Sequence, residues 1–103
     1  MKHQLILKCA EIFFVHPRDI LGHARFGFLI PPRFALYKAL RNRGMSMPQI
    51  GRMTNRDHST IRYGLERADY MIERNPVFAE RVRILTELKP ELAPLPDELK
   101  ESD

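Results

Sequence analysis

The sequence has a single cysteine, so it forms no internal disulfide and no cluster of thiolate metal ligands. It lacks any apolar run near the roughly 20 residues that span a bilayer. Residues 1–10 lack the layout and the cleavage site of a secretory signal. The Gly-x-x-x-x-Gly-Lys-Ser/Thr loop of an ATPase module is absent too. We therefore expect a cytoplasmic chain that enters no membrane and binds no nucleotide.

Residue types that hold metals or carry out catalysis are scattered rather than grouped. The spacing typical of a metal site is absent from the set His3, Cys9, His16 and His23, so ordinary packing explains these residues better. No nucleophile stands beside an evident base. We expect no catalytic residue, no metal and no cofactor, and enzyme activity is the weakest hypothesis.

Charge is abundant and unevenly distributed. Residues 1–86 contain 15 Lys or Arg against 7 Asp or Glu, whereas residues 87–103 contain 2 against 6, which leaves a net charge of +4. Most of the positive charge is arginine, whose planar guanidinium suits phosphates and guanine edges. A basic domain with an acidic tail indicates a polyanionic partner, most often nucleic acid, although many small domains are basic without one.

The size and the periodicity favour one small helical domain. The chain has 103 residues and 44% hydrophobic content, and its apolar residues recur at helical spacing without an alternating strand pattern or an internal repeat. We expect an all-α fold of about five to six helices. Helices are predicted over 4–15, over 33–43, from Ser46 to the interruption at Thr54, over a long segment after Asp57, and from Pro76 onward.

The remaining segments are predicted to connect or to follow these helices. Residues 18–21 indicate a short turn, and residues 22–32 indicate an apolar loop, part of which folds back onto the core. From Lys89 the composition becomes acidic and rich in proline. We therefore expect a helical domain over 1–88 and a disordered tail over 89–103.

Several residues indicate where the helices begin and end. Gly44 is expected to end the helix before it in a left-handed conformation. Ser46 and Gln49 form the pattern of a capping box. Asp57 is expected to be the N-cap of the long helix, and Asn75 the N-cap of the helix that begins at Pro76.

The segment 46–65 is the most informative part of the chain. Its first helix is short and has the small Gly51 after the apolar Ile50, and a tight polar turn follows at residues 54–56. The second helix has a predicted buried stripe of Ile61, Leu65, Ala68 and Ile72, with Ser59, Arg62, Tyr63 and Glu66 facing outward. This pattern predicts a helix-turn-helix, whose second helix enters the DNA major groove. The same skeleton also occurs in helix hairpins that bind no nucleic acid.

The same segment resembles a known family. It contains the motif Ser46-Met47-Pro48-Gln49-Ile50-Gly51 and the motif Asn55-Arg56-Asp57-His58-Ser59-Thr60-Ile61. The first resembles the Ser-Leu-Pro-Glu-Ile-Gly helix of the C-terminal DNA-binding domain of the bacterial replication initiator DnaA. The second resembles the Gly-Arg-Asp-His-Thr-Thr-Val signature of the same domain. The resemblance extends more loosely over residues 6–88. It implies a DnaA C-terminal, Trp-repressor-like fold that binds double-stranded DNA.

The resemblance implies base-contacting roles for particular residues. Asp57, His58 and Ser59 match the triplet that opens the recognition helix and meets bases in the major groove. Pro48 matches a family proline that packs against a base from the first helix. Alternatively, Asp57 is only an N-cap and Pro48 only a first-turn helix residue.

Further matches concern the minor groove and the DNA backbone. Arg25 lies eight residues before Arg33, at the spacing of a family arginine that enters the minor groove. Arg33 and Thr60 match phosphate-contacting positions. We expect Arg56 and Arg62 to contact the backbone as well, with a solvated side chain as the alternative for Arg62.

The chain also departs from the family pattern. Residues 26–30 are apolar where the family loop is rich in arginine, and Arg62 and Tyr63 replace the usual leucine and histidine. The main hypothesis is a nucleoid-associated transcriptional regulator, bacterial or phage-like, that reads its own DNA site. The alternatives are a replication regulator that competes for initiator boxes, and an adaptor without DNA binding. The tail or the 26–30 loop would then bind RNA polymerase or another protein.

Overall fold

A computed structural model describes residues 2–89, with side chains from Gln4 onward. In this range the elements are α1 (Lys2–Phe13), α2 (Pro17–Leu21), the 3-10 helix η1 (Gly27–Leu29), α3 (Ile30–Asn42), α4 (Met47–Thr54), α5 (His58–Arg74) and α6 (Pro76–Glu87). No strand occurs among residues 2–89, and the all-α prediction is confirmed. The tail expected over 89–103 lies outside the described residues except for Lys89, and the side chain of His3 lies outside them too.

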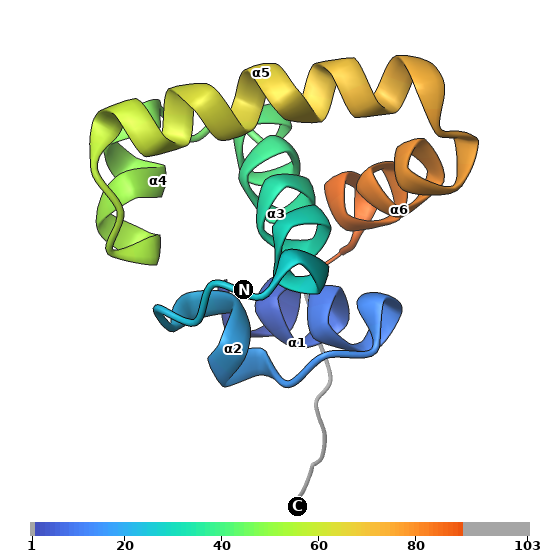
Figure 1. The fold of residues 1–103 in the computed structure, drawn as a ribbon. Coiled ribbons are helices and arrows are strands. Elements are labelled where there is room, and N and C mark those ends of the chain that lie inside the picture. Colours follow the sequence, from blue (N-terminus) through green and yellow to red (C-terminus); the bar gives the residue numbers. More distant parts are fainter. Residues whose placement is uncertain (1, 90–103) are drawn as a thin grey trace, which may run out of the picture.

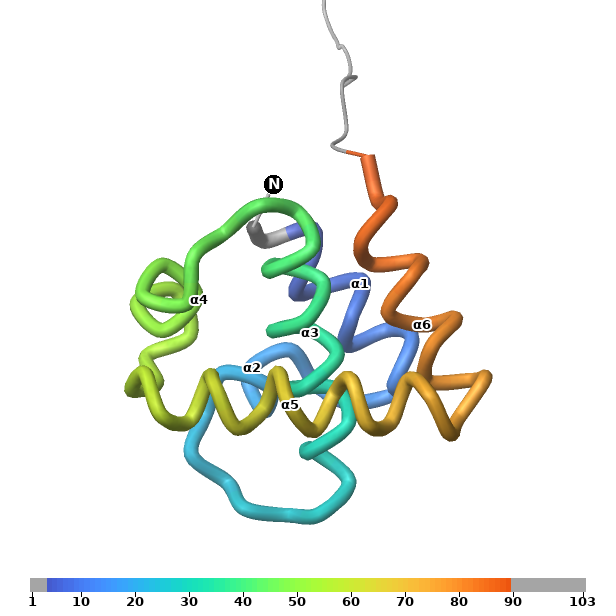
Figure 2. Tube along the Cα trace, turned by 90° about the horizontal axis from the view of Figure 1, so that it is seen from above, coloured from blue at the N-terminus to red at the C-terminus, as the bar shows by residue number. Residues whose placement is uncertain are grey.

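Helix α3 is the centre of the fold. It contacts α1, α2, α4, α5, α6 and η1. Figure 1 shows α5 running across the top of the molecule over α3, with α1 and α2 below α3 and α6 to one side. Each helix contributes to one core, whose fully buried members include Leu5, Cys9, Ile20, Leu36, Ile50, Ile61 and Leu85. The long helix α5 is therefore held along its length, and its first turn extends past α3 beside α4 (Figure 2).

The predicted caps are confirmed. The Ser46 hydroxyl accepts from the Gln49 N–H at 3.2 Å, and the Gln49 side chain accepts from the Ser46 N–H at 2.8 Å. Asp57 caps α5, and the Asn75 side chain accepts from the Phe78 N–H to cap α6. Gly44 has a φ of 104°, the left-handed conformation that a glycine adopts without steric cost. These local contacts end one helix and begin the next within a few residues.

The predicted boundaries before α3 are partly wrong. Helix α1 ends at Phe13 rather than Val15, because Phe14 takes a left-handed φ of 58° and His16 is extended before Pro17. Residues 17–21 form a helix rather than a turn, capped by the His16 imidazole, which accepts from the Arg18 N–H at 3.1 Å. This capping gives His16 a structural role that packing alone did not predict.

Helix α3 begins at Ile30, three residues before the predicted start. Two prolines, Pro31 and Pro32, lie in its first turn, where a backbone N–H has no helical partner to lose. The apolar residues around this boundary differ in burial. Leu29 and Pro32 are buried and anchor the segment, as predicted, whereas Phe26 and Phe28 are 60% and 62% exposed. Only some of the apolar side chains of this segment are therefore buried.

Among residues 2–89, no helix has both the length and the apolar composition needed to cross a bilayer. The same range contains no group of three or more His, Cys, Asp or Glu side chains placed to hold a metal. The Cys9 thiol donates to the Pro32 carbonyl at 3.3 Å, and burial raises the pKa of this thiol to about 12. Cys9 is therefore a neutral core residue at physiological pH.

Candidate nucleic-acid interface

The connection between α4 and α5 is a tight turn. Asn55 adopts the left-handed conformation (φ 56°, ψ 50°), and the Gly51 carbonyl accepts from the N–H groups of both Asn55 and Arg56. A Cβ atom at Gly51 would lie 2.7 Å from the Arg56 carbonyl oxygen and 3.8 Å from the Ile61 side chain. A small residue is therefore required here, as predicted, but by the backbone of the turn more than by the crossing helix.

The first turn of α5 exposes short polar side chains. Asp57 accepts through one carboxylate oxygen from the Thr60 N–H at 2.8 Å and from the Ser59 hydroxyl at 2.9 Å. These bonds, led by that of the Thr60 N–H, hold the pKa of the Asp57 carboxyl below its usual range. His58, Ser59 and Thr60 are exposed. The N-cap role of Asp57 is thus confirmed, and its contact with bases stays a prediction.

Two predicted base readers from different helices share one surface hollow. This turn hollow, of about 420 Å³, is lined by Met47, Pro48, Gly51, Arg52, Asn55, Arg56 and His58. The fold thereby brings Pro48 of α4 next to His58 of α5. An exposed proline and an exposed imidazole at the mouth of a concave surface can contact the apolar and polar parts of a base edge.

All of the predicted backbone-contacting residues except Arg62 line a second hollow, together with Arg25, which was predicted to enter the minor groove. This arginine hollow, of about 360 Å³, is lined by His23, Arg25, Arg33, Arg56 and Thr60. None of its lining side chains is a carboxylate, so its field attracts anions. Arg56 borders both hollows, which makes them parts of one continuous surface. Arg25, from the segment before α3, and Thr60, from α5, meet only because the chain folds.

Arg33 and Arg56 also have partners inside the protein. Arg33 donates from Nε to the Ile20 carbonyl at 3.0 Å and from Nη2 to the carbonyls of Asp19 and Gly22 at 2.7 and 3.1 Å. Arg56 donates from Nη2 to the same Gly22 carbonyl and from Nη1 to the carbonyls of Leu21, Thr54 and Asn55. The two guanidinium groups therefore hold the end of α2 against the helix-turn-helix.

This arrangement places two positive charges close together. Partial burial, and then the neighbouring Arg56 charge, lowers the pKa of Arg33 from its usual value. An arginine nonetheless stays charged at physiological pH. A bound anion would relieve the repulsion between the two groups. The structure thus gives Arg33 and Arg56 a structural role that the sequence did not predict, and leaves the predicted phosphate contact compatible with it.

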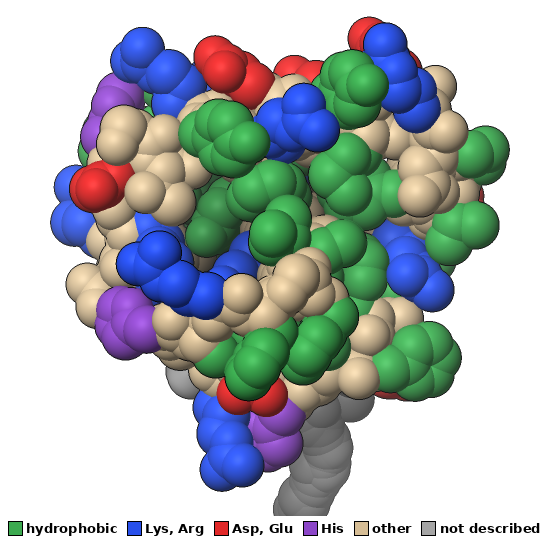
Figure 3. Space-filling view, in the orientation of Figure 1, with side chains coloured by type: hydrophobic (Ala, Val, Ile, Leu, Met, Phe, Trp, Pro, Cys, Tyr) green, Lys and Arg blue, Asp and Glu red, His purple; other side chains and the backbone are tan. Residues whose placement is uncertain are grey.

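The next residues of α5 continue the exposed face. Arg62 is exposed one turn after His58, in line with the prediction. Tyr63 is 59% exposed, and its ring lies edge-on to Phe34 with the centroids 6.1 Å apart. Figure 3 shows Lys, Arg and His side chains, with an acidic side chain among them, along the edge formed by α4, the start of α5 and the segment before α3. Hydrophobic side chains spread over the middle of that face, and further Lys and Arg side chains lie along its other edges.

Two residues of this surface were not predicted from the sequence. His23 is exposed and lines the arginine hollow, although its spacing from other histidines had indicated ordinary packing. Arg52 is exposed in the turn hollow. His23 lies two residues before Arg25, and this proximity in the chain is the signal from which His23 could have been predicted. Arg52 lies one residue after Gly51, on the opposite side of α4 from the core.

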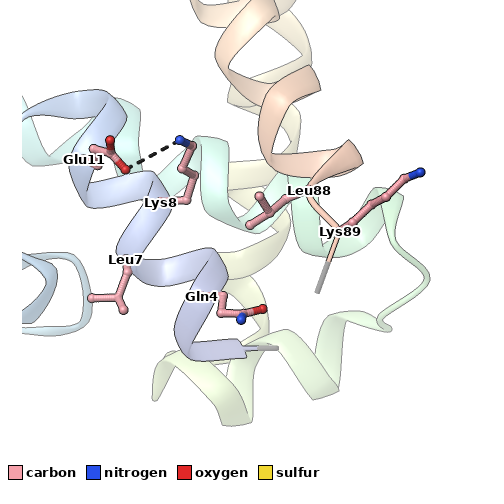
Figure 4. Close-up of a pocket in the computed structure, with 6 residues that line it drawn as sticks. All are labelled: Gln4, Leu7, Lys8, Glu11, Leu88 and Lys89. Carbon is pink, nitrogen blue, oxygen red and sulfur yellow. Dashed lines mark ion pairs between the residues drawn. The ribbon is translucent and has the colours of Figure 1, made fainter. Parts of the chain in front are cut away.

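A further hollow, of about 300 Å³, lies away from the predicted residues. It is formed by α1 and the end of α6, with Gln4, Leu7, Lys8, Glu11, Leu88 and Lys89 around it (Figure 4). Lys8 and Glu11 form an ion pair of 3.6 Å across one turn of α1. None of the predicted site residues lines this hollow, so the sequence-based site and the two hollows of the helix-turn-helix remain the candidate interface.

Comparison with known proteins agrees with this geometry. Residues 38–68, which cover the end of α3, all of α4 and most of α5, match a family model described as a helix-turn-helix domain. The fold and the site therefore define the chain as a helix-turn-helix protein. Its more specific type follows from similarity that reaches well beyond this segment.

The chain is similar to the chromosomal replication initiator protein DnaA of several bacteria. It is 30% identical to that of Cereibacter sphaeroides over 83 residues, which is 79% of this chain and 18% of the relative. It is 27% identical to that of a Jannaschia species over 84 residues, which is 80% of this chain and 18% of the relative. It is 36% identical to that of Gluconobacter oxydans over 56 residues, which is 53% of this chain and 12% of the relative.

The chain therefore carries a DnaA-like helix-turn-helix domain. It spans less than one fifth of the length of these relatives. The family match and the similarity together support binding of double-stranded DNA.

Proposed function

We propose that this chain is a sequence-specific transcriptional regulator, which acts at the nucleoid in the cytoplasm by occupying a site on double-stranded DNA. The observation that carries the proposal is the continuous surface formed by the turn hollow and the arginine hollow around the first turn of α5. Beside the turn hollow, the first turn of α5 exposes the short polar side chains of Asp57 and Ser59. The arginine hollow offers positive charge without a lining carboxylate. Base reading and phosphate attraction need these two properties side by side.

The roles within this surface follow from the chemistry of each group. Asp57 has one carboxylate oxygen engaged in the cap, and the other can accept from a cytosine amine. The His58 imidazole and the Ser59 hydroxyl address base edges in the major groove. Pro48 packs against a base from α4. Because α5 is held by α3, these groups meet the groove in a fixed register.

The second set of residues holds the sugar-phosphate backbone. Arg33, Arg56 and Arg62 supply charge, and the Thr60 hydroxyl supplies a donor on the same hollow. Arg25 approaches the adjacent minor groove, where a narrow A·T-rich stretch concentrates negative potential. Arg33 and Arg56 keep their carbonyl partners in and just after α2, so they present preorganised donors rather than mobile side chains.

Affinity for duplex DNA should fall as salt rises. Each phosphate neutralised releases counterions, so the logarithm of affinity should fall linearly with the logarithm of salt, with a slope of about −0.9 per phosphate contact. Fluorescence anisotropy of a labelled duplex over a salt series measures this slope. Arg62→Ala should make the slope shallower by about 1. Arg83→Ala is the control, since Arg83 lies on α6 in ion pairs with Glu80 and Glu87 and should leave the slope unchanged.

The absence of binding at low salt would contradict the proposed function. If Arg62→Ala and Arg83→Ala made the slope shallower by the same amount, DNA binding would depend on the net positive charge of the protein rather than on a defined contact surface.

His58→Ala should reduce the preference for the selected site over unrelated duplexes. One lost base contact is worth about 1–3 kcal/mol of discrimination, which is roughly a 5-fold to 150-fold loss of preference. The site is first enriched by the wild-type chain from random duplexes, and competition binding then measures the ratio. Glu73→Ala, an exposed change at the far end of α5, should leave that ratio intact. An unchanged ratio for His58→Ala would remove His58 from the set of base readers.

A second function is favoured by the names of the relatives, which are replication initiators. A chain with this domain can act as a replication regulator that competes for initiator boxes. Competition between this chain and an initiator for the same labelled duplex distinguishes it from a transcriptional regulator with its own site. If the site enriched from random duplexes differs from the boxes that the initiator binds, the replication role is excluded.

A further inference from the structure

Two exposed phenylalanine rings follow Arg25, a lining residue of the arginine hollow, in the chain. Phe26 and Phe28 are 60% and 62% exposed, and their rings lie nearly parallel, with centroids 5.4 Å apart and planes 7° apart. They pack on each other rather than into the core. An exposed aromatic pair of this size on a small domain marks a binding surface more often than a neutral one.

The pair is held firmly by its surroundings. The Leu29 N–H donates to the Phe26 carbonyl at 3.0 Å within η1, and the Leu29 side chain is fully buried. Phe28 lines a hollow together with Pro31, Met71 and Val77, and its ring stacks on that of Phe26. Phe28 therefore supports Phe26, and Phe26 is the member of the pair that follows Arg25 directly.

The neighbourhood of Phe26 determines what it can meet. Arg25 lines the arginine hollow with Arg33, Arg56 and Thr60, and no carboxylate lines that hollow. The segment 22–29 projects on one side of α5, next to the helix-turn-helix (Figure 2). A partner that lies on both Arg25 and Phe26, which are neighbours in the chain, presents negative charge and flat apolar groups together. Duplex DNA has this combination in its phosphates, its sugars and its stacked bases.

We propose that Phe26, backed by Phe28, enters the minor groove beside Arg25 as an apolar wedge and partly unstacks one base step. The inference rests on the proposed DNA binding and adds a deformation of the duplex to it. Apolar wedges of this kind bend DNA by about 20–90° toward the major groove. Bending would bring the flanking phosphates toward the arginine hollow. Flexible pyrimidine–purine steps would be preferred at a position that makes no hydrogen bond with the protein.

The test uses a fluorophore placed at the wedge. The chain has no tryptophan, so Phe26→Trp introduces a unique indole whose emission reports stacking on bases. The probe is the duplex that the wild-type chain enriches, and binding is followed separately by anisotropy of a label on the DNA. Phe14→Trp is the matched control, because Phe14 is 87% exposed at the end of α1 and lines neither hollow of the interface.

The expected result is loss of indole emission on DNA binding for Phe26→Trp and no loss for Phe14→Trp. In parallel, Phe26→Ala should abolish the bend measured by energy transfer between the ends of the duplex and weaken binding by about tenfold. Unchanged emission in a duplex that binds, or a bend that persists in Phe26→Ala, would overturn the wedge and leave the proposed function standing.

Two other outcomes would also overturn the wedge. Emission that changes with protein concentration in the absence of DNA would assign the phenylalanine pair to contacts between copies of the chain. Failure of the wild-type chain to bind any duplex would overturn the proposed function together with the wedge. Circular dichroism of each variant confirms that it is folded, so that loss of the bend is read as loss of the aromatic contact.

Discussion

Replacing Ile61 with alanine should lower the free energy of unfolding by about 2–5 kcal/mol. Ile61 is fully buried in the first turns of α5, where it faces Gly51 of α4 and joins the helix-turn-helix to the common core. The change removes three carbons from a site that the tight turn prevents from collapsing. Small domains have only about 5–15 kcal/mol of stability in total. The loss is therefore a large share of what holds the recognition helix in place.

Urea denaturation followed by helical circular dichroism measures this loss. Glu66→Ala is the control, because Glu66 is exposed on the same helix and its removal should change stability by no more than about 0.5 kcal/mol. DNA affinity of Ile61→Ala should fall only under conditions where part of the protein is unfolded. A stable Ile61→Ala variant would show that α4 and α5 do not depend on this contact.

Replacing Arg33 with alanine should reduce both stability and DNA affinity. Three carbonyls at the end of α2 lose their donor, and charged hydrogen bonds of this kind contribute about 1–3 kcal/mol in partly buried positions. The same change removes a positive charge from the arginine hollow, which should weaken binding to all sequences alike. Denaturation and anisotropy on a selected and an unrelated duplex measure the two effects separately.

Arg33→Lys separates the two roles of this side chain. A lysine keeps the charge but has no planar fork with which to reach three carbonyls at once, so stability should stay reduced while DNA affinity partly recovers. If Arg33→Ala left the free energy of unfolding unchanged, the carbonyl contacts would be incidental. If it left DNA affinity unchanged once folding was corrected for, Arg33 would be a structural residue alone.

The sequence-based predictions that agree best with the structure are those that depend on residues close together in the chain. The capping box at Ser46, the N-caps at Asp57 and Asn75, and the left-handed Gly44 are set by side chains that bond to backbone within three or four positions. The stripe along α5 follows from the helical period. The start of α3 was missed because Pro31 and Pro32 are compatible with a loop and with a first helical turn, and only packing decides between them.

The candidate site was predicted as a set of residues but not as a surface. Pro48 and His58 lie close enough in sequence for a helix-turn-helix pattern to pair them. Arg25 and Thr60 are 35 positions apart, and only the crossing of α3 by α5 brings them into one hollow. Part of the apolar segment 22–32 was expected to fold back onto the core, but the sequence did not indicate which part; Leu29 and Pro32 are buried, whereas Phe26 and Phe28 are exposed.

Short-range hydrogen bonds and periodic burial require only nearby residues, so the sequence alone was enough to predict the tight turn between α4 and α5, the polar start of the recognition helix and the helices other than α2. Where the arginines act depends instead on long-range packing. An arginine side chain is long, and its donors take whichever acceptors the fold places within reach. For Arg33 and Arg56 those acceptors are carbonyls of α2 and of the turn. The same packing leaves their charge on the face that carries His58 and Thr60.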